Sequence, residues 1–242
     1  MEKSLKRFYY RGRLGESFVM LDGTEHHHLS IVKRCKVGEV VMLVCGDEFD
    51  YRYEITGINR EETRLSFISK SKNTKNPKTE LVVFVGLIRL ENLSLIVEKL
   101  GEIGATRIVP FTCARSNTPA SSVNISKLGT VAEQSCKQSG RSIPLKIHPV
   151  LKFNEMISSL SQLDEVFYAD RGEKKSKISR NETTSNEKRY GLVIGPEGGL
   201  TIDENLAITE ISTPITLGSR TLRSETAAMV GTALVLAKLG EL

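Results

Sequence analysis

A glycine-rich turn follows an apolar segment near the carboxyl-terminal end of the chain, and its residue types could bind a nucleotide-like ligand. Gly195, Gly198 and Gly199 carry no Cβ, so the backbone can come close to a ligand. Turns of this kind commonly hold phosphate on helix N–H groups. Here Glu197 places a carboxylate inside the turn, and no Gly-Lys-Ser/Thr sequence follows. The turn therefore favours a ligand with adenosine, no phosphate and preferably a positive charge, and S-adenosylmethionine is such a ligand.

Basic residues cluster near the amino-terminal end of the chain. Lys33 and Arg34 follow three adjacent histidines, residues 26–28, and Arg7 lies upstream. The cluster indicates either a surface for a polyanion or a solvated face, and spacing alone favours the solvated face. Three adjacent histidines cannot all face one metal ion, and no cysteine or carboxylate lies at ligand spacing. We therefore expect no bound metal.

The composition is typical of a globular protein. Of the 242 residues, 39% are hydrophobic and 26% are charged, and the net charge of +5 permits a polyanionic partner without requiring one. No apolar run reaches the roughly 18–20 residues that span a bilayer, so we expect no membrane association. The four cysteines show no C-x-x-C spacing, which is typical of reduced thiols and predicts a cytoplasmic protein.

The first part of the chain reads as β-structure. Residues 39–45, 49–56 and 63–68 are strand-like, and the middle run alternates apolar and polar side chains with the period of a half-buried strand. Several short strands without a long helix predict a small barrel. Residues 69–78 are polar and charged and contain a proline, so they are the best candidate for a linker.

After this linker, strands and helices alternate. Residues 81–88 are continuously apolar, as in a strand buried on both faces, and a helix follows with Asn92 as a plausible N-cap and Gly104 at its end. Further strands are expected at 106–111, 144–150, 165–169, 190–194 and 214–217, and further helices at 125–140, 153–160, 202–211 and 224–239. This order predicts an α/β fold with a parallel sheet covered by helices.

The last predicted helix is apolar on nearly every side. Such a helix needs burial all round, in the core and against a second subunit, although a purely intramolecular core helix is the alternative. Ser224 could cap it, and Glu225 would lie favourably in its first turn. Residues 171–189 are rich in polar and charged side chains and predict an exposed, mobile loop.

Four stretches of the chain match one pattern: 27–34; 100–110 with Arg115 and Ser116; 133–141 with Pro144; and the pair 194–199 and 217–227. Taken together, they resemble one family, the uridine-N3 methyltransferases of the SPOUT superfamily, which act on 16S rRNA. The similarity spans nearly the whole chain in order, and the last pair at this separation is its most specific part. The family usually has proline where Ser219 stands, isoleucine where Thr221 stands and leucine where Lys33 stands.

The resemblance implies the fold and the partners. It implies a small RNA-binding, PUA-like β-barrel in residues 1–72, followed by a SPOUT α/β methyltransferase domain in residues 78–242 with a deep C-terminal trefoil knot. It also implies a homodimer, with the cofactor pocket in the knot next to the partner subunit. The expected substrate is 16S rRNA, alone or in the small ribosomal subunit.

The resemblance further implies a pocket for S-adenosylmethionine. Glycine backbone groups would read the adenine edge, and leucine and isoleucine side chains would form apolar walls, whereas the alternative is that the glycines only serve tight turns. The cofactor residues carried over are Leu87, Ile194, Gly195, Glu197, Gly198, Gly199, Leu217, Gly218, Leu222 and Ser224.

Methylation of uridine N3 requires loss of the imide proton and stabilisation of the negative charge that develops. Arg223 is the first candidate for stabilising that charge, and Glu225 could accept the proton or orient Arg223. The alternative for both is helix capping and a local ion pair. The residues expected to contact RNA are Arg7, Lys33, Arg34, Arg115 and Arg141.

Three other functions compete with this interpretation. They are a methyltransferase acting on the ribose 2′-OH of RNA, a non-catalytic RNA-binding protein with the same fold, and a phosphate-binding nucleotide hydrolase. The N-terminal barrel and the 217–227 pattern argue against the first, and the intact glycines, Arg223 and Glu225 argue against the second. Glu197 and the missing lysine argue against the third.

Overall fold

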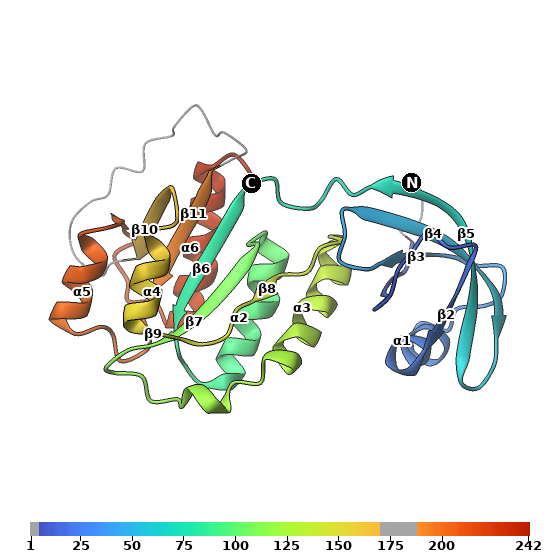
Figure 1. The fold of residues 1–242 in the computed structure, drawn as a ribbon, viewed down its shortest axis with the longest axis horizontal. Helices are drawn as coiled ribbons and strands as arrows, with labels where there is room; N and C mark the ends of the chain where they lie inside the picture. The colour runs from blue at the N-terminus through green and yellow to red at the C-terminus, as the bar shows by residue number, and fades with distance from the viewer. Residues whose placement is uncertain (1–4, 170–187) are drawn as a thin grey trace. The chain divides into compact units, whose positions relative to one another are not determined.

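Two compact units make up the described part of the chain, residues 5–169 and 188–242 of a computed structural model. The first unit contains residues 1–76 together with 133–144, and the second contains residues 77–132 and 145–242. Figure 1 shows the helices and strands of each. The predicted loop at 171–189 lies outside the described residues up to residue 187, and Arg189 is already part of a strand. Within the described residues, no helix is long and apolar enough to cross a membrane.

The first unit is built on a five-stranded sheet with the order β1-β3-β4-β5-β2. The β1–β3 pair is parallel and the other pairs are antiparallel. Tyr51, Tyr53 and Ile55 of β4 are buried, and the residues between them are exposed, which confirms the predicted alternation. The strands are β1 (Arg7–Tyr9), β2 (Phe18–Asp22), β3 (Val40–Val44), β4 (Phe49–Ile58) and β5 (Glu62–Lys72).

Two local features of this unit differ from the sequence prediction. The strand β5 runs through residues 69–72, the first part of the predicted linker, because these residues pair with Phe49–Arg52 of β4. A short helix, α1 (Gly23–His27), continues into a π-helical turn, η1 (His28–Val32). These elements were not predicted, since each is too short to show a helical period.

The second unit contains a parallel sheet of seven strands, in the order β12-β10-β11-β6-β7-β8, with β9 also paired to β7. This confirms the predicted alternation of strands and helices. The strands are β6 (Glu80–Gly86), β7 (Arg107–Thr112), β8 (Lys146–Ile147), β9 (Leu151–Lys152), β10 (Glu165–Ala169), β11 (Arg189–Ile194) and β12 (Thr213–Ile215). The helices are α2 (Leu90–Ile103), a 3₁₀ turn η2 (Ala120–Ser122), α3 (Ile125–Ser139), α4 (Phe153–Leu160), α5 (Ile202–Thr209) and α6 (Ser224–Lys238). The last part of α3, residues 133–139, belongs to the first unit.

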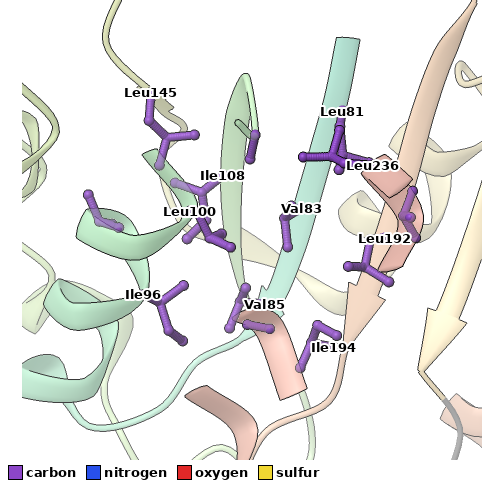
Figure 2. Close-up of a cluster of buried hydrophobic side chains, with 14 of the residues drawn as sticks. Leu81, Val83, Val85, Ile96, Leu100, Ile108, Leu145, Leu192, Ile194 and Leu236 are labelled. Atoms are coloured by element: carbon purple, nitrogen blue, oxygen red, sulfur yellow. The ribbon is translucent and has the colours of Figure 1, made fainter. Parts of the chain in front are cut away.

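The central strand β6 buries side chains on both faces of this sheet. Leu81, Val83 and Val85 pack in a cluster with residues of α2 and α6, as Figure 2 shows. Val82 and Phe84 belong to a second cluster, which includes Met156 of α4 and Ile208 of α5. A continuous apolar run is therefore needed here, because neither face of β6 meets water.

Some predicted boundaries were wrong. Helix α2 begins at Leu90, because the carbonyl of Arg89 accepts the bond from the Leu93 amide at 3.0 Å, so Arg89 and not Asn92 is the N-cap. Likewise Arg223, not Ser224, precedes α6, and its carbonyl accepts from the Ala227 amide at 2.8 Å. The strand predicted at 144–150 is reduced to Lys146–Ile147, since Pro144 and Pro149 have no N–H to donate.

Candidate functional site

A cavity of about 320 Å³ lies in the second unit, at the carboxyl ends of its parallel strands. Tyr168 and Ala169 end β10, Ile194 ends β11, and the segment 217–222 follows β12. The start of α6 adds Ser224 and Ala227. Open parallel sheets bind their ligands at this edge, where loops after several strands converge. The cavity is therefore the candidate active site of this unit.

Close backbone packing shapes the glycine-rich turn. The Gly199 amide donates to the carbonyl of Pro196 at 2.9 Å, and Gly199 has a φ of 69°, which a residue with a Cβ rarely adopts. A Cβ on Gly198 would lie 3.1 Å from the Arg115 carbonyl oxygen. The glycines at 198 and 199 thus allow the turn to pack against the loop after β7.

The start of α5 is capped by its own side chains. The Thr201 hydroxyl accepts from the Glu204 amide at 3.2 Å, and the Glu204 carboxylate accepts from the Thr201 amide at 2.9 Å. The same carboxylate accepts a 2.7 Å bond from the Ala114 amide. The Glu204 carboxylate therefore stands where a phosphate-binding turn would offer its free amides. This disfavours phosphate, as expected, but through Glu204 and not through the Glu197 of the sequence argument.

The structure brings most of the predicted cofactor residues together around the cavity. Leu87 is an exception, because it does not line the cavity: its side chain is 1% exposed and lies in the core, and its amide donates to the Phe111 carbonyl. Glu197 belongs to the same turn, but its side chain is exposed and accepts a 3.5 Å bond from Asn92. The predicted residues that line the cavity are Ile194, Gly195, Gly198, Gly199, Leu217, Gly218, Leu222 and Ser224.

Sequence reasoning missed part of the lining. Tyr168 and Ala169 belong to a strand whose neighbours in the sheet are not evident from the sequence, and Asn205 lies on α5. Arg220 is the one arginine of the 217–222 segment, and its place inside a matching motif could have identified it. Arg115, which was expected to contact RNA, lies against the glycine-rich turn, where its Nη1 donates to the Gly198 carbonyl at 3.3 Å.

The pair Arg223 and Glu225 lies at the first turn of α6, next to Ser224 in the cavity wall. The Arg223 side chain is 87% exposed, and its Nη1 is 4.0 Å from Glu225 Oε1. Glu225 is only 12% exposed, and its Oε2 has no hydrogen-bond partner within the described residues. An exposed guanidinium beside a buried carboxylate can bind a developing anion while the carboxylate orients it.

The remaining basic residues have different surroundings in the first unit. The Arg7 guanidinium donates to both oxygens of Asp50, at 3.1 and 2.6 Å, and to the Arg141 carbonyl at 3.0 Å. Arg141 is 3% exposed, and burial lowers the pKa of its guanidinium. Lys33 and Arg34 are exposed, and Arg34 has a positive φ of 49°. Of Arg7, Lys33, Arg34 and Arg141, only Lys33 and Arg34 therefore expose most of the side chain to a partner.

No group of three or more histidine, cysteine or carboxylate side chains in residues 5–169 and 188–242 could hold a metal ion.

The chain is 28% identical over 234 residues to the Ribosomal RNA small subunit methyltransferase E of Rickettsia conorii, with 95% of this chain and 94% of the relative covered. It is 26% identical to the protein of the same name from Bacillus subtilis, with 86% of each chain covered.

Solved structures share the fold. A Ribosomal RNA small subunit methyltransferase E from Neisseria gonorrhoeae, bound to S-adenosyl methionine, has a TM-score of 0.83 at 20% identity and covers 97% of this chain and 98% of its own. A Legionella pneumophila protein, solved in complex with the bound cofactor SAM, has a TM-score of 0.87 at 18% identity, with the same shares covered. A model of the RNA methyltransferase PUA domain matches residues 21–68, and a model of the RNA methyltransferase domain matches residues 74–236. The match to the RNA methyltransferase domain covers more than half of the chain, so the chain belongs to the RNA methyltransferase family.

Proposed function

We propose that the chain transfers a methyl group from S-adenosylmethionine to N3 of a uridine in the 16S rRNA of the small ribosomal subunit. The relatives named Ribosomal RNA small subunit methyltransferase E match along nearly the whole chain, and their name supports small-subunit ribosomal RNA as the substrate. The choice of N3 rests on the family resemblance of the 217–227 segment. The observation that carries the proposal is the cavity in which this segment meets the glycine-rich turn, directly beside Arg223.

The cavity suits the cofactor in size and in chemistry. Its volume of about 320 Å³ falls in the range of small-molecule sites, about 300–1,000 Å³. Ile194, Leu217 and Leu222 would hold the adenosine between apolar walls, while the backbone of 195–199 and Gly218 offers amides and carbonyls. When bound, S-adenosylmethionine supplies an electrophilic methyl group on a sulfonium. The self-capped start of α5 disfavours a triphosphate in the same place.

Arg223 would stabilise the charge that develops on the uracil when its N3 proton leaves. Its guanidinium is permanently protonated and largely exposed, so a base delivered to the cavity mouth can reach it. Glu225 would orient Arg223 or accept the proton, since its buried Oε2 has no other partner among the described residues. Arg115 would support the turn and meet a substrate phosphate.

Residues 1–72 would form a PUA-like barrel that binds RNA, and residues 78–242 a SPOUT domain with a C-terminal trefoil knot. Tracing the chain in a crystal structure tests the knot. Because small ribosomal subunits assemble in the cytoplasm, we place the enzyme there. The exposed cations Lys33 and Arg34 are the first candidates for RNA contacts, whereas the ion pair of Arg7 and the burial of Arg141 favour structural roles.

A homodimer would cover the open side of α6. Val230, Ala233, Leu234 and Ala237 follow one another at helical spacing, and Leu234 is 39% exposed. An apolar stripe of this kind is covered in most proteins. Leu234→Glu should therefore yield a monomer in sedimentation velocity, and an unchanged dimer would refute this interface.

Replacement of Arg223 tests the chemistry. Arg223→Ala should lower turnover on small-subunit rRNA by about 100-fold or more, because it removes one fixed donor to the developing anion. Calorimetry should give a cofactor affinity close to that of the unmodified chain. Arg189→Ala, an exposed arginine at the start of β11, is the matched control and should leave both quantities unchanged. Turnover of Arg223→Ala close to that of the control would exclude a catalytic role for Arg223.

A further inference from the structure

A second and larger cavity, of about 1,120 Å³, lies entirely within the first unit. It is bounded by β1, by α1 and η1, by β4, and by the last turns of α3. Its volume exceeds the roughly 300–1,000 Å³ typical of sites for a single small molecule. The cavity is therefore large enough for several linked units of a polymer.

The lining of this cavity is strongly basic. Among the described residues that line it, Glu25 is the single carboxylate, and the cations are Lys6, Arg7, Lys33, Arg52, Lys75 and Lys137. Three of these cations have acidic partners: Lys6 pairs with Glu39, Arg7 with Asp50, and Lys137 with Glu25.

The other three cations, Lys33, Arg52 and Lys75, are exposed, and within the described residues none of them forms a salt bridge. They leave the cavity with an excess of unpaired positive charge. Charges in a concave site focus the field on a ligand and attract anions more strongly than charges on a flat surface. The ligand is therefore expected to be a polyanion.

Helix α3 adds groups that can read bases. Gln134 and Gln138 are one turn apart, so they project from the same side of α3, and both are exposed in the cavity lining. Each carboxamide offers both donors and an acceptor, which is the pattern that pairs with base edges.

Ion pairs fix this part of α3 to the strand-rich part of the unit. Arg11 pairs with Glu133 at 2.8 Å. Lys137, which lies between the two glutamines in the sequence, pairs with Glu25. The Asn73 side chain donates to the Gly140 carbonyl at 2.9 Å, just beyond the end of α3. The glutamines therefore stand on a wall that is already in place before a ligand binds, which lowers the entropic cost of recognition.

We propose that this cavity binds a single-stranded RNA segment that flanks the methylated nucleotide, and that it reads part of the sequence of that segment. Lys33, Arg52 and Lys75 contact phosphates, and Gln134 and Gln138 contact bases. The strand is single, because its base edges are then accessible, whereas an A-form duplex hides them in a deep, narrow groove. The inference rests on the proposed RNA substrate and adds a site that selects it.

The charge contribution is tested with a labelled single-stranded RNA of roughly 12 nucleotides, a length suited to a single-strand site. Affinity is measured by fluorescence anisotropy over a range of salt concentrations. The variant Lys33→Ala/Arg52→Ala/Lys75→Ala should bind at least about tenfold more weakly, and its log–log salt slope should fall by about 2, since each phosphate contact on a single strand contributes roughly 0.7.

A matched control removes three exposed cations that do not line the cavity, Lys36, Arg60 and Lys127. The control variant should keep the salt slope of the unmodified chain. Equal losses in the two triple variants would overturn the proposal, because binding would then depend on net charge alone. Equal affinity of the unmodified chain for a duplex of the same length would also overturn it.

The reading of bases is tested with the variant Gln134→Ala/Gln138→Ala. It should lose most of the discrimination among oligonucleotides of different sequence, by about tenfold, at an unchanged salt slope. Unchanged discrimination would refute the role of the glutamines. Methyl transfer to small-subunit rRNA is measured in parallel: its absence in the unmodified chain would refute the proposed function, while cavity-dependent binding of single strands would still stand.

Discussion

Gly86, at the end of β6, is the position where one added methyl group should displace the glycine-rich turn most directly. A Cβ there would lie 2.5 Å from both the nitrogen and Cδ of Pro196, and 3.1 Å from the Gly195 carbonyl carbon. Ordinary contact begins at 3.4 Å. The proline ring is part of the backbone and cannot rotate away, so β6 and the glycine-rich turn must move apart by about 1 Å in Gly86→Ala.

Overpacking of this kind costs about 1–3 kcal/mol. The displaced turn forms one wall of the small cavity, so the affinity for S-adenosylmethionine should fall by about tenfold or more, and turnover by about 100-fold because of the misplacement. Calorimetry measures the affinity, and urea unfolding measures the stability. A dissociation constant within about twofold of that of the unmodified chain would refute the claim that the turn binds the cofactor.

Gly129→Ala provides the matched control, because a Cβ on Gly129 meets no atom within 4 Å. Gly129 lies in the middle of α3, where alanine is the better helix former. This variant should gain about 0.5–1 kcal/mol of stability and keep its cofactor affinity.

Three further variants probe the framework. Asp50→Ala should cost about 3 kcal/mol in urea unfolding, since it leaves the mostly buried Arg7 guanidinium without its carboxylate. Thr201→Ala should cost about 1 kcal/mol in thermal unfolding, because it breaks the capping box with Glu204. Burial, and then the charge of Lys137, lower the pKa of His28 below its usual 6.5. The unfolded chain therefore takes up a proton at His28 more readily than the folded chain does. The stability that neutral His28 contributes is present above pH 6.5 and is lost as pH falls through the lowered pKa. In urea unfolding at low pH, His28→Asn should lose less stability than the unmodified chain.

The sequence was most informative where a pattern is local. The alternation at 49–56 and the apolar run at 81–88 identified β4 and β6. Successive side chains of a strand point to opposite faces, so the order of apolar and polar residues shows directly whether one face or both are buried. The glycines at 195, 198 and 199 similarly indicated the turn that borders the small cavity. Helix ends were less accurate, since Asn92 and Ser224 are good capping types but do not occupy the capping positions.

Features that depend on distant parts of the chain were not predictable. The end of α3 belongs to the first unit through contacts such as that of Arg11 with Glu133, which are 122 residues apart. The large basic cavity therefore could not be assembled from the cluster at Lys33 and Arg34 alone. Arg115 and Arg141 were both expected to contact RNA, and only tertiary packing determines that Arg115 also donates to the glycine-rich turn and that Arg141 is buried.

The position of the transferred methyl group tests the central claim most directly. Small ribosomal subunits from cells that lack this protein are incubated with the purified chain and with S-adenosylmethionine carrying a labelled methyl group, and the rRNA is digested to nucleosides for mass spectrometry. We predict label in N3-methyluridine at a single site in 16S rRNA, and none with Arg223→Ala. Label on a ribose 2′-oxygen, or no transfer to the subunit or to its free rRNA, would contradict the account.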